Sequence, residues 1–390
     1  MHPLFSCPTT IMMKNGLSHS ITAILADSYP EVKTIMIVSD KGIVQAGLMD
    51  EILSSLEEHG YAVHLFTEVK PNPREEDCEE GCRQFRLTNP ELVLAIGGGS
   101  VIDTAKAIAL VGPTTYNIND MVPKIPKEIE PAHLVCMPTT AGTGAEVTRS
   151  SVLTLGKSSH LKITLKSEKI RPQLALIDPV LSYSAPVHVK IYAGVDAFVH
   201  ALESYTNKRS NPVSDVLAVR AMQLAFENLP LIHQDKDAEP AHGKMMEASL
   251  LAGMSFASSD VAAIHCLSEA LSSLYDTPHG LANSILLLPV MTYNAETSSD
   301  VYGNLSRDLG IASPEETDEE ATSKLLSKIA SFVQQLEIPS LQSLSYVKEK
   351  DFKQLSEIAF KNGSNINNAR EMTKKDYLTV LEQQLTVTKI

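Results

Sequence analysis

The sequence has little cysteine and no long apolar run. Its five cysteines are scattered, and the one closely spaced pair, Cys78 and Cys82, has no second pair with which to complete a zinc site. No window reaches the roughly 18 uninterrupted apolar residues of a membrane span. The first residues lack the basic head and apolar core of a secretory signal. These absences predict a cytoplasmic protein without a disulfide framework.

Positive charge is also in short supply. The 33 Lys and Arg residues are outnumbered by 47 Asp and Glu residues, which gives a formal net charge of −14. This balance argues against nucleic acid or an anionic membrane as a partner and leaves a small molecule as the expected ligand. With 390 residues, of which 43% are hydrophobic, the chain is long enough for two domains with substantial cores.

The first half of the chain alternates short apolar runs with helical patterns. Helices are predicted over 45–59 and 101–110. Strands are predicted over 34–39, 61–66, 92–96, 133–137 and 174–177. Strands separated by helices of this size indicate an α/β, mostly parallel, doubly wound sheet.

From Ser182 onward a helical period of 3.6 residues dominates. It predicts helices over 186–206, 212–229, 242–257, 261–274 and 280–295, followed by several more. The stretch 313–323 is interpreted as acidic and solvated. We therefore place a domain boundary near 181, with a dinucleotide-binding α/β domain over 1–181 and an all-helical metal-binding and catalytic domain over 182–390.

Two loops rich in small residues follow predicted strands. Gly97, Gly98 and Gly99 lie between a strand and a helix, where backbone N–H groups attract phosphate, although such a turn is structural about as often as functional. A second loop, 139–144, ends another strand, and the two together favour a dinucleotide. Asp40 ends the first predicted strand. Its carboxylate would bind an adenosine ribose and repel a 2′-phosphate, which predicts NAD(H) rather than NADP(H).

A carboxylate and three imidazoles form the candidate metal site. Asp196 and His200 are four residues apart, so in a helix they share one face, and His265 and His279 would complete the set. Any one of these residues alone is more often a satisfied core residue than a ligand. Together they predict a centre with nitrogen and oxygen ligands.

Five motifs carry a family resemblance. They are A-I-G-G-G-S-V-I-D-T-A-K at 95–106, P-T-T-A-G-T-G-A-E-V-T at 138–148, G-V-D-A-F-V-H-A-L-E at 194–203, A-G-M-S-F at 252–256 and Y-D-T-P-H-G-L-A-N at 275–283. The chain resembles the iron-containing (group III) alcohol dehydrogenases, with their dehydroquinate synthase-like architecture. The resemblance implies metal ligands Asp196, His200, His265 and His279. The implied cofactor positions are Asp40, Asn72, Gly98, Gly99, Ser100, Thr139, Thr140, Thr143, Lys162 and Leu181. Ser150, Arg149 and Phe256 are the implied substrate residues.

Three segments depart from the family pattern. Glu269 stands where the family usually has a histidine, four residues after the third ligand, and is assigned a catalytic role together with His279. Glu269 is expected to orient His265, to relay the alcohol proton or to point into solvent, and the sequence leaves all three open. Residues 258–260 replace the family's Asn-Ala/Val-Gly, and 363–370 replace a Cys-Thr-x-Thr-Asn-Pro-Arg segment. All three are expected near the substrate pocket.

The resemblance implies an NAD-dependent alcohol dehydrogenase or aldehyde reductase. One divalent metal is expected between the domains, Fe(II) by family and Zn(II) by affinity, acting on a short primary alcohol or aldehyde. Arg149 suggests a substrate with an anionic group, and its alternative is a surface arginine paired with an acid. We also expect a homodimer or higher homo-oligomer. Rival readings are a metal-dependent lyase or synthase of the same fold class, and a non-catalytic nucleotide-binding scaffold.

Overall fold

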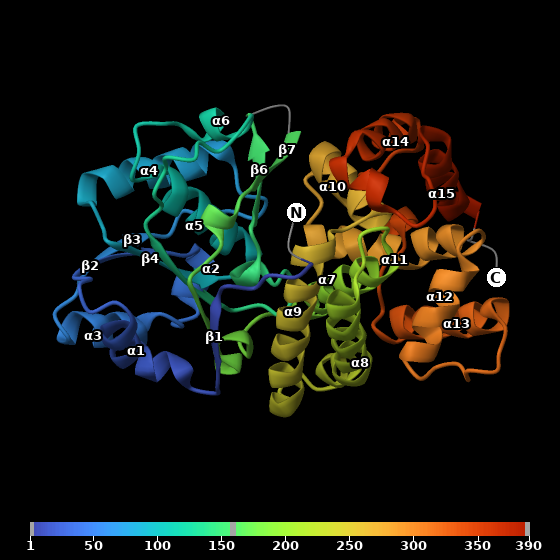
Figure 1. The fold of residues 1–390 in the computed structure, drawn as a ribbon, viewed down its shortest axis with the longest axis horizontal. Helices are drawn as coiled ribbons and strands as arrows, with labels where there is room; N and C mark the ends of the chain where they lie inside the picture. Colours follow the sequence, from blue (N-terminus) through green and yellow to red (C-terminus); the bar gives the residue numbers. More distant parts are fainter. Residues whose placement is uncertain (1–3, 157–160, 387–390) are drawn as a thin grey trace. The chain divides into compact units, whose positions relative to one another are not determined.

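The computed structural model describes residues 4–156 and 161–386. Two compact units divide the chain, Cys7–Pro186 and Val187–Ile390, the latter joined by the short N-terminal segment. The division falls at the start of helix α7 (Val187–Thr206), five residues beyond the boundary expected from the sequence. Figure 1 shows one unit built around a sheet and the other built of helices, and each is described here by itself.

Six parallel strands form the sheet of the first unit. Its order is β1-β8-β5-β4-β2-β3. The strands are β1 (Thr10–Met13), β2 (Thr34–Val38), β3 (Ala62–Phe66), β4 (Leu92–Gly97), β5 (His133–Pro138) and β8 (Leu174–Ile177). The helices are α1 (Ile21–Ser28), α2 (Lys41–Gln45), α3 (Asp50–Glu58), α4 (Glu75–Thr88), α5 (Gly99–Val111) and α6 (Ile118–Met121). The predicted parallel, doubly wound sheet is confirmed.

Both faces of this sheet are covered by helices. Successive side chains of a strand point to opposite faces, and β2 follows this rule. Ile35 and Ile37 pack in one buried cluster with α1 and α3. Met36 and Val38 pack in a second cluster with α4 and α5. Burial on both sides explains why these strands read as continuous apolar runs in the sequence.

Three strands and one helix break were not predicted. β1 is short, and β6 (Ser150–Leu155) and β7 (Leu161–Lys166) form a separate antiparallel pair. The expected helix over 45–59 is divided into α2 and α3. Gly47 lies between them with a φ of 69°, a left-handed conformation that glycine adopts without strain.

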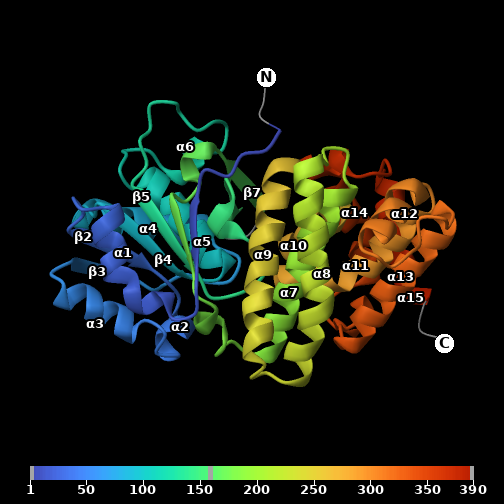
Figure 2. The same ribbon diagram turned by 60° about the horizontal axis from the view of Figure 1, so that its bottom comes forward.

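The second unit is helical throughout its described residues. After α7 come α8 (Pro212–Gln234), α9 (Glu239–Ser259), α10 (Ala263–Tyr275), α11 (His279–Ala295), α12 (Ser299–Asp308), α13 (Asp318–Gln335), α14 (Phe352–Lys361) and α15 (Lys374–Thr386). Figure 2 shows α7, α8 and α9 side by side. A Cβ on Gly194 of α7 would lie 2.4 Å from Leu229 Cδ1 of α8, so the glycine allows the two helices to approach closely.

Two details complete this unit. The stretch 313–323, expected to be only a solvated segment, contains the start of α13, where Thr317 and Glu320 form a capping box. A search of the described helices finds no single one with the length and apolar composition of a membrane span. The pair α9 and α10 passes that test jointly, but it is bent by 101°.

Candidate metal and nucleotide sites

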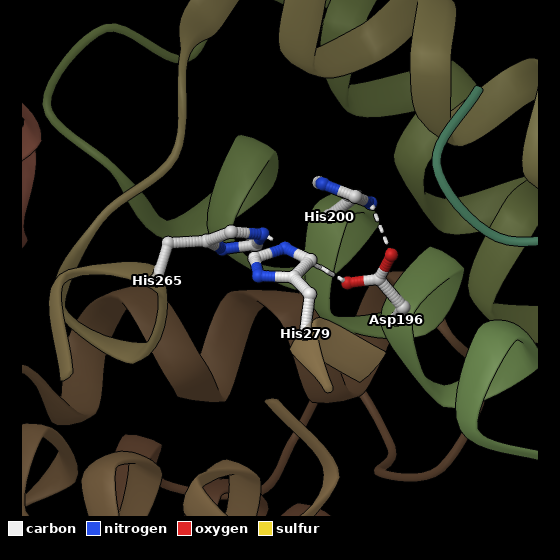
Figure 3. Close-up of side chains that lie close together, drawn as sticks. All are labelled: Asp196, His200, His265 and His279. Carbon is white, nitrogen blue, oxygen red and sulfur yellow. Dashed lines mark ion pairs between the residues drawn. The ribbon is translucent and has the colours of Figure 1, made fainter. Parts of the chain in front are cut away.

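The four predicted metal ligands lie together in the helical unit. Asp196 and His200 come from α7, His265 from α10 and His279 from α11, and one side-chain atom of each lies within 4.8 Å of the others. Asp196 Oδ2 is 3.8 Å from His200 Nδ1, and Asp196 Oδ1 is 3.6 Å from His279 Nε2. Figure 3 shows the carboxylate and the three rings converging.

Burial and neighbouring charges shift the pKa values of both Asp196 and His265. Both are almost fully buried. Burial alone would raise the pKa of Asp196, but the three neighbouring imidazoles and the Asn283 amide lower it, so this carboxylate stays ionised at neutral pH. Burial opposes the charged form of His265, whereas Glu203, Asp196 and Glu269 together raise its pKa. One carboxylate and three imidazoles are a donor set that suits a divalent transition metal.

Glu203 determines which ring nitrogen of His265 faces the other three candidate metal ligands. The Glu203 carboxylate, on α7, accepts hydrogen bonds from Ala262 N at 2.8 Å, Ile264 N at 2.5 Å and His265 Nδ1 at 2.6 Å. Because Nδ1 donates its proton to a carboxylate, His265 Nε2 keeps a lone pair directed toward Asp196. Glu203 was not assigned a role from the sequence, although it closes the G-V-D-A-F-V-H-A-L-E motif.

Glu269 therefore does not orient His265 through Nδ1, which was one of its three expected roles. Its Oε2 accepts a hydrogen bond from Asn362 Nδ2 at 2.6 Å, at the end of α14. The residue is half-buried and its charge contributes to the raised pKa of His265. The Asn362 contact and the half-buried position fit either a proton relay or a residue without a catalytic role, and the relay is the role to test.

The residues at 258–260, which differ from the family pattern, take part in contacts that hold α7, α9 and the start of α10 together. Ser259 Oγ lies 2.6 Å from Ser204 Oγ in a fully buried hydroxyl cluster that joins α7 to α9. Asp260 has a φ of 103°, a conformation that favours the glycine of the family pattern. Its carbonyl oxygen accepts a hydrogen bond from Asn207 Nδ2 at 2.7 Å. These contacts hold the turn that leads into α10 and His265.

In the α/β unit, the two predicted loops lie against each other. Gly98 caps α5 at the end of β4, and its added Cβ would lie 3.1 Å from Thr140 Oγ1. A Cβ on Gly99 would lie 2.5 Å from Thr143 Cγ2. The absence of side chains at these glycines is what allows the loops after β4 and β5 to meet. Ser100 follows in the first turn of α5, and Thr139 donates its backbone N–H to Gly97 O at 3.0 Å.

Three of the remaining predicted cofactor residues, Asp40, Asn72 and Leu181, follow β2, β3 and β8 in the chain, and the fourth, Lys162, belongs to β7. Asp40 lies two residues beyond β2, the neighbour of β4, and its Oδ1 accepts from Gly42 N at 2.8 Å and Ile43 N at 3.0 Å as the cap of α2. Lys162 Nζ donates to Asn72 Oδ1 at 2.9 Å. Leu181 is buried in a short 3₁₀ helix (Pro179–Ser182) that follows β8. Asp40 Oδ2 takes no part in the capping bonds.

The three predicted substrate residues fall in different units. Phe256, in the helical unit, stacks on His200 with ring centroids 4.3 Å apart. Arg149 and Ser150 belong to the α/β unit. Arg149 NH1 lies 2.9 Å from Glu168 Oε1, which is the pairing with an acid that the sequence left as the alternative to substrate binding.

A contact between Ser150 and a buried lysine, Lys106, was not predicted from the sequence. Lys106 is fully buried, and its Nζ donates to Thr148 Oγ1 at 2.8 Å and to Ser150 O at 2.7 Å. Burial raises the pKa of Asp103 to about 6 and that of Glu146 to about 7. Lys106, Asp103 and Glu146 belong to the A-I-G-G-G-S-V-I-D-T-A-K and P-T-T-A-G-T-G-A-E-V-T motifs. Both motifs therefore contain buried residues that hold the unit together as well as candidate cofactor contacts.

A doubly wound parallel sheet and a buried Asp-His₃ group are features of an enzyme that combines a nucleotide site with a metal site. The family model described as iron-containing alcohol dehydrogenase matches residues 8–179, and that of the Fe-containing alcohol dehydrogenase family, C-terminal, matches 190–385. The chain belongs to the iron-containing alcohol dehydrogenase family.

Individual relatives agree with this membership. The choline dehydrogenase of Bacillus subtilis is 33% identical over 92% of this chain and 89% of its own length. A crystal structure of 1,3-propanediol oxidoreductase matches with a TM-score of 0.92 at 28% identity, covering 97% of this chain and 99% of that one. The sulfoacetaldehyde reductase of Bifidobacterium kashiwanohense, solved with NAD⁺, matches with a TM-score of 0.87 at 27% identity, covering 99% and 100%.

Proposed function

We propose that this protein is an NAD(H)-dependent alcohol dehydrogenase or aldehyde reductase. Its substrate would be a short primary alcohol or the corresponding aldehyde, with one divalent metal held by Asp196, His200, His265 and His279. The observation that carries the proposal is the convergence of these four ligand atoms within 4.8 Å. Fe(II) follows from the family, and Zn(II) suits the same nitrogen and oxygen donors.

The bound metal would act as a Lewis acid toward the alcohol or carbonyl oxygen, and the nicotinamide would exchange the hydride. The side chains of the chain supply the positioning. Glu203 keeps the Nε2 lone pair of His265 available for coordination, and the Phe256 ring covers one face of His200. A fixed imidazole tautomer and a shielded ring favour a stable centre.

We propose that the glycine loop and its neighbours bind NAD(H). The N–H groups at the start of α5 would face the pyrophosphate, with Gly98, Gly99 and Ser100 at the turn. Thr139, Thr140, Thr143, Asn72, Lys162 and Leu181 would complete the cofactor site. Asp40 would accept the ribose hydroxyls through Oδ2, since Oδ1 already caps α2, and its charge would disfavour the 2′-phosphate of NADP(H).

For Glu269 we propose the proton relay. Asn362 donates to one of its oxygens and fixes the carboxylate one helical turn beyond His265, in the position where the family usually has an imidazole. Its place near the ligands supports transfer of the alcohol proton toward solvent. Glu269→Gln should then retain metal but lose one ionisation from the pH profile of kcat, and loss of the metal instead would contradict the relay.

The charge of the substrate is a second, narrower proposal. The names of relatives include choline, which is positively charged, 1,3-propanediol, which is neutral, and sulfoacetaldehyde, which is negatively charged. Arg149 would bind an anionic group by sharing its guanidinium with Glu168; its Nε is buried without a hydrogen bond among the described residues. Arg149→Ala should raise KM for anionic aldehydes and leave neutral ones unchanged if this is correct. Equal effects on both would remove the anionic proposal.

A lyase or synthase and a non-catalytic scaffold are the alternatives. The decisive assay mixes the protein with Fe(II) or Zn(II), NADH and short aldehydes of each charge, and follows NADH absorbance. Steady oxidation of NADH is expected, and no oxidation with any aldehyde favours the alternatives. His200→Ala should abolish both activity and bound metal. The matched control is His242→Ala. His242 is a buried histidine of α9 that hydrogen-bonds to Lys236 O, and its variant should keep both activity and bound metal.

We further propose that the protein is cytoplasmic and forms a homodimer or higher homo-oligomer. Light scattering would measure the oligomeric state.

A further inference from the structure

Helix α5, which begins at the glycine loop, also holds the segment that contains the second loop. Its Lys106 is fully buried. The Nζ atom donates hydrogen bonds to Thr148 Oγ1 at 2.8 Å and to Ser150 O at 2.7 Å. These two residues end the segment that starts at Thr139, whose backbone N–H donates to Gly97 O at 3.0 Å. Both ends of this segment are therefore fixed, one to β4 and the other to α5.

Asp103, one turn before Lys106 on α5, holds the neighbouring strand pair. Its backbone carbonyl oxygen accepts a hydrogen bond from Ser151 Oγ at 2.9 Å, and its Oδ2 accepts one from Val152 N at 3.1 Å. Both partners belong to β6, which pairs with β7, the strand of the predicted cofactor residue Lys162. One turn of α5 thus supports the second loop and the β6–β7 pair, and the start of the same helix belongs to the glycine loop.

The charge of Lys106 is costly to bury. Its Nζ lies 3.9 Å from Asp103 Oδ1, and Glu146 adds a second negative charge and Arg171 a positive charge nearby. An apolar side chain of similar size often stabilises a fold as well as a buried ion pair does. What the ammonium adds to this packing is two directed hydrogen bonds. A methionine would fill a similar volume, but it could not fix the two acceptors in place.

We propose that Lys106 is a positioning residue for the nucleotide site. Through its two hydrogen bonds it fixes the second loop against the glycine loop, where Gly99 faces Thr143. It acts through the loop and not on the cofactor. A loop that is already ordered spares NAD(H) the entropy cost of ordering it, so the dissociation constant is lower. This inference rests on the proposed NAD(H) site and adds to it a residue outside the predicted cofactor contacts.

Two variants separate positioning of the loop from stability of the unit. Lys106→Met removes the hydrogen bonds and leaves the Asp103 carboxylate without its buried counter-charge, so the urea midpoint should fall. Lys106→Met combined with Asp103→Asn removes both charges, and the Asn oxygen can still accept from Val152 N, so part of the midpoint should return. In both variants the NADH dissociation constant, measured by fluorescence titration, should rise by about tenfold, because NADH must then order the second loop as it binds.

Hydrogen exchange in protein without added nucleotide measures the loop directly. In both Lys106 variants the amides of 139–148 should gain more in exchange rate than those of β4 and β5. Leu56→Ala is the control, because Leu56 is buried on the other face of the sheet. It should lower the urea midpoint and keep both the NADH dissociation constant and the loop exchange. Thr148→Val removes one acceptor at constant size and should raise the dissociation constant by about threefold.

If either the dissociation constant or the loop exchange stays at its wild-type value in Lys106→Met, Lys106 does not position the loop. If Lys106→Met does not fold, unchanged NADH binding in Thr148→Val overturns the inference in its place. A rise of equal size in Leu56→Ala would also overturn it, as would a full return to wild-type binding in the double variant, since the unpaired charge would then be the cause. Wild-type protein that binds no NADH would instead refute the proposed cofactor site, and the exchange measurement would still test the contact of Lys106 with the loop.

Discussion

Removal of the Glu203 carboxylate should destabilise the protein and weaken metal binding together. The side chain is almost fully buried and accepts three hydrogen bonds, from Ala262 N, Ile264 N and His265 Nδ1. Each buried donor left without an acceptor costs about 1–3 kcal/mol. Glu203→Ala leaves three donors without an acceptor, so we expect the free energy of unfolding to fall by about 3–9 kcal/mol, a large part of the 5–15 kcal/mol that typically stabilises a domain.

Glu203→Gln is the more informative change because it retains one acceptor oxygen. Its amide nitrogen must face either Ile264 N–H or the pair formed by Ala262 N–H and His265 Nδ1–H, so about 1–3 kcal/mol should be lost. Zn(II) affinity should fall by about 10–100-fold as His265 loses its fixed tautomer.

Urea unfolding of chelator-treated protein, followed by circular dichroism, measures the first effect, and chelator competition measures the second. Glu247→Gln is the control, since Glu247 pairs with Lys244 on the surface and should change stability by less than about 0.5 kcal/mol. If Glu203→Gln stays within that margin and keeps wild-type Zn(II) affinity, Glu203 does not position His265.

Three further changes test the α/β unit. Asp40→Gly should raise the ratio of kcat/KM with NADPH to kcat/KM with NADH by at least tenfold. Because glycine is an acceptable N-cap, the free energy of unfolding should fall by only a few tenths of a kcal/mol. Wild-type protein that uses both cofactors equally well would contradict the placement of Asp40. Gly99→Ala brings a Cβ to 2.5 Å from Thr143 Cγ2 and should weaken NADH binding at least tenfold in a fluorescence titration, whereas Gly363→Ala, with open space around it, should not. Glu146 has a pKa raised by burial from 4.5 to about 7, so the folded state binds the extra proton and stability should fall as pH rises through that window. Glu146→Gln cannot bind this proton, so the free energy of unfolding in urea should decrease less between pH 5 and pH 8 in the variant than in wild type. Equal decreases would exclude Glu146 as the source of the pH dependence.

The sequence predicted the parts of the fold that repeat a local pattern. The buried strands β2, β4 and β5 read as apolar runs, and α7 as a helix with Asp196 and His200 on one face. It missed β1, which is short and lies at the edge of the sheet. It also missed the β6–β7 pair, in which Val152, Leu153 and Thr154 show no strict alternation of apolar and polar residues.

Residues whose role depends on distant contacts could not be assigned from the sequence. Glu203 is 62 positions from the His265 that it orients, and Asn283 is 87 positions from Asp196. Glu269, four residues from His265, was the natural candidate for the orienting role because helical spacing is visible in a sequence and tertiary pairing is not. Lys106 appeared as one residue of a motif, and its burial became evident only in the folded unit.

The pairing of β1 with β8 also bears on the order in which the sheet assembles. Thr10 faces Leu174, and Asp178 accepts hydrogen bonds from Gly16 N and Ser18 N, about 160 positions away. Closing a flexible loop of that length costs roughly 4–5 kcal/mol of chain entropy. During synthesis β1 therefore stays without its partner until about 160 further residues have been made. In refolding it should join last, so a protease pulse would cut near its residues while β2, β4 and β5 are already protected.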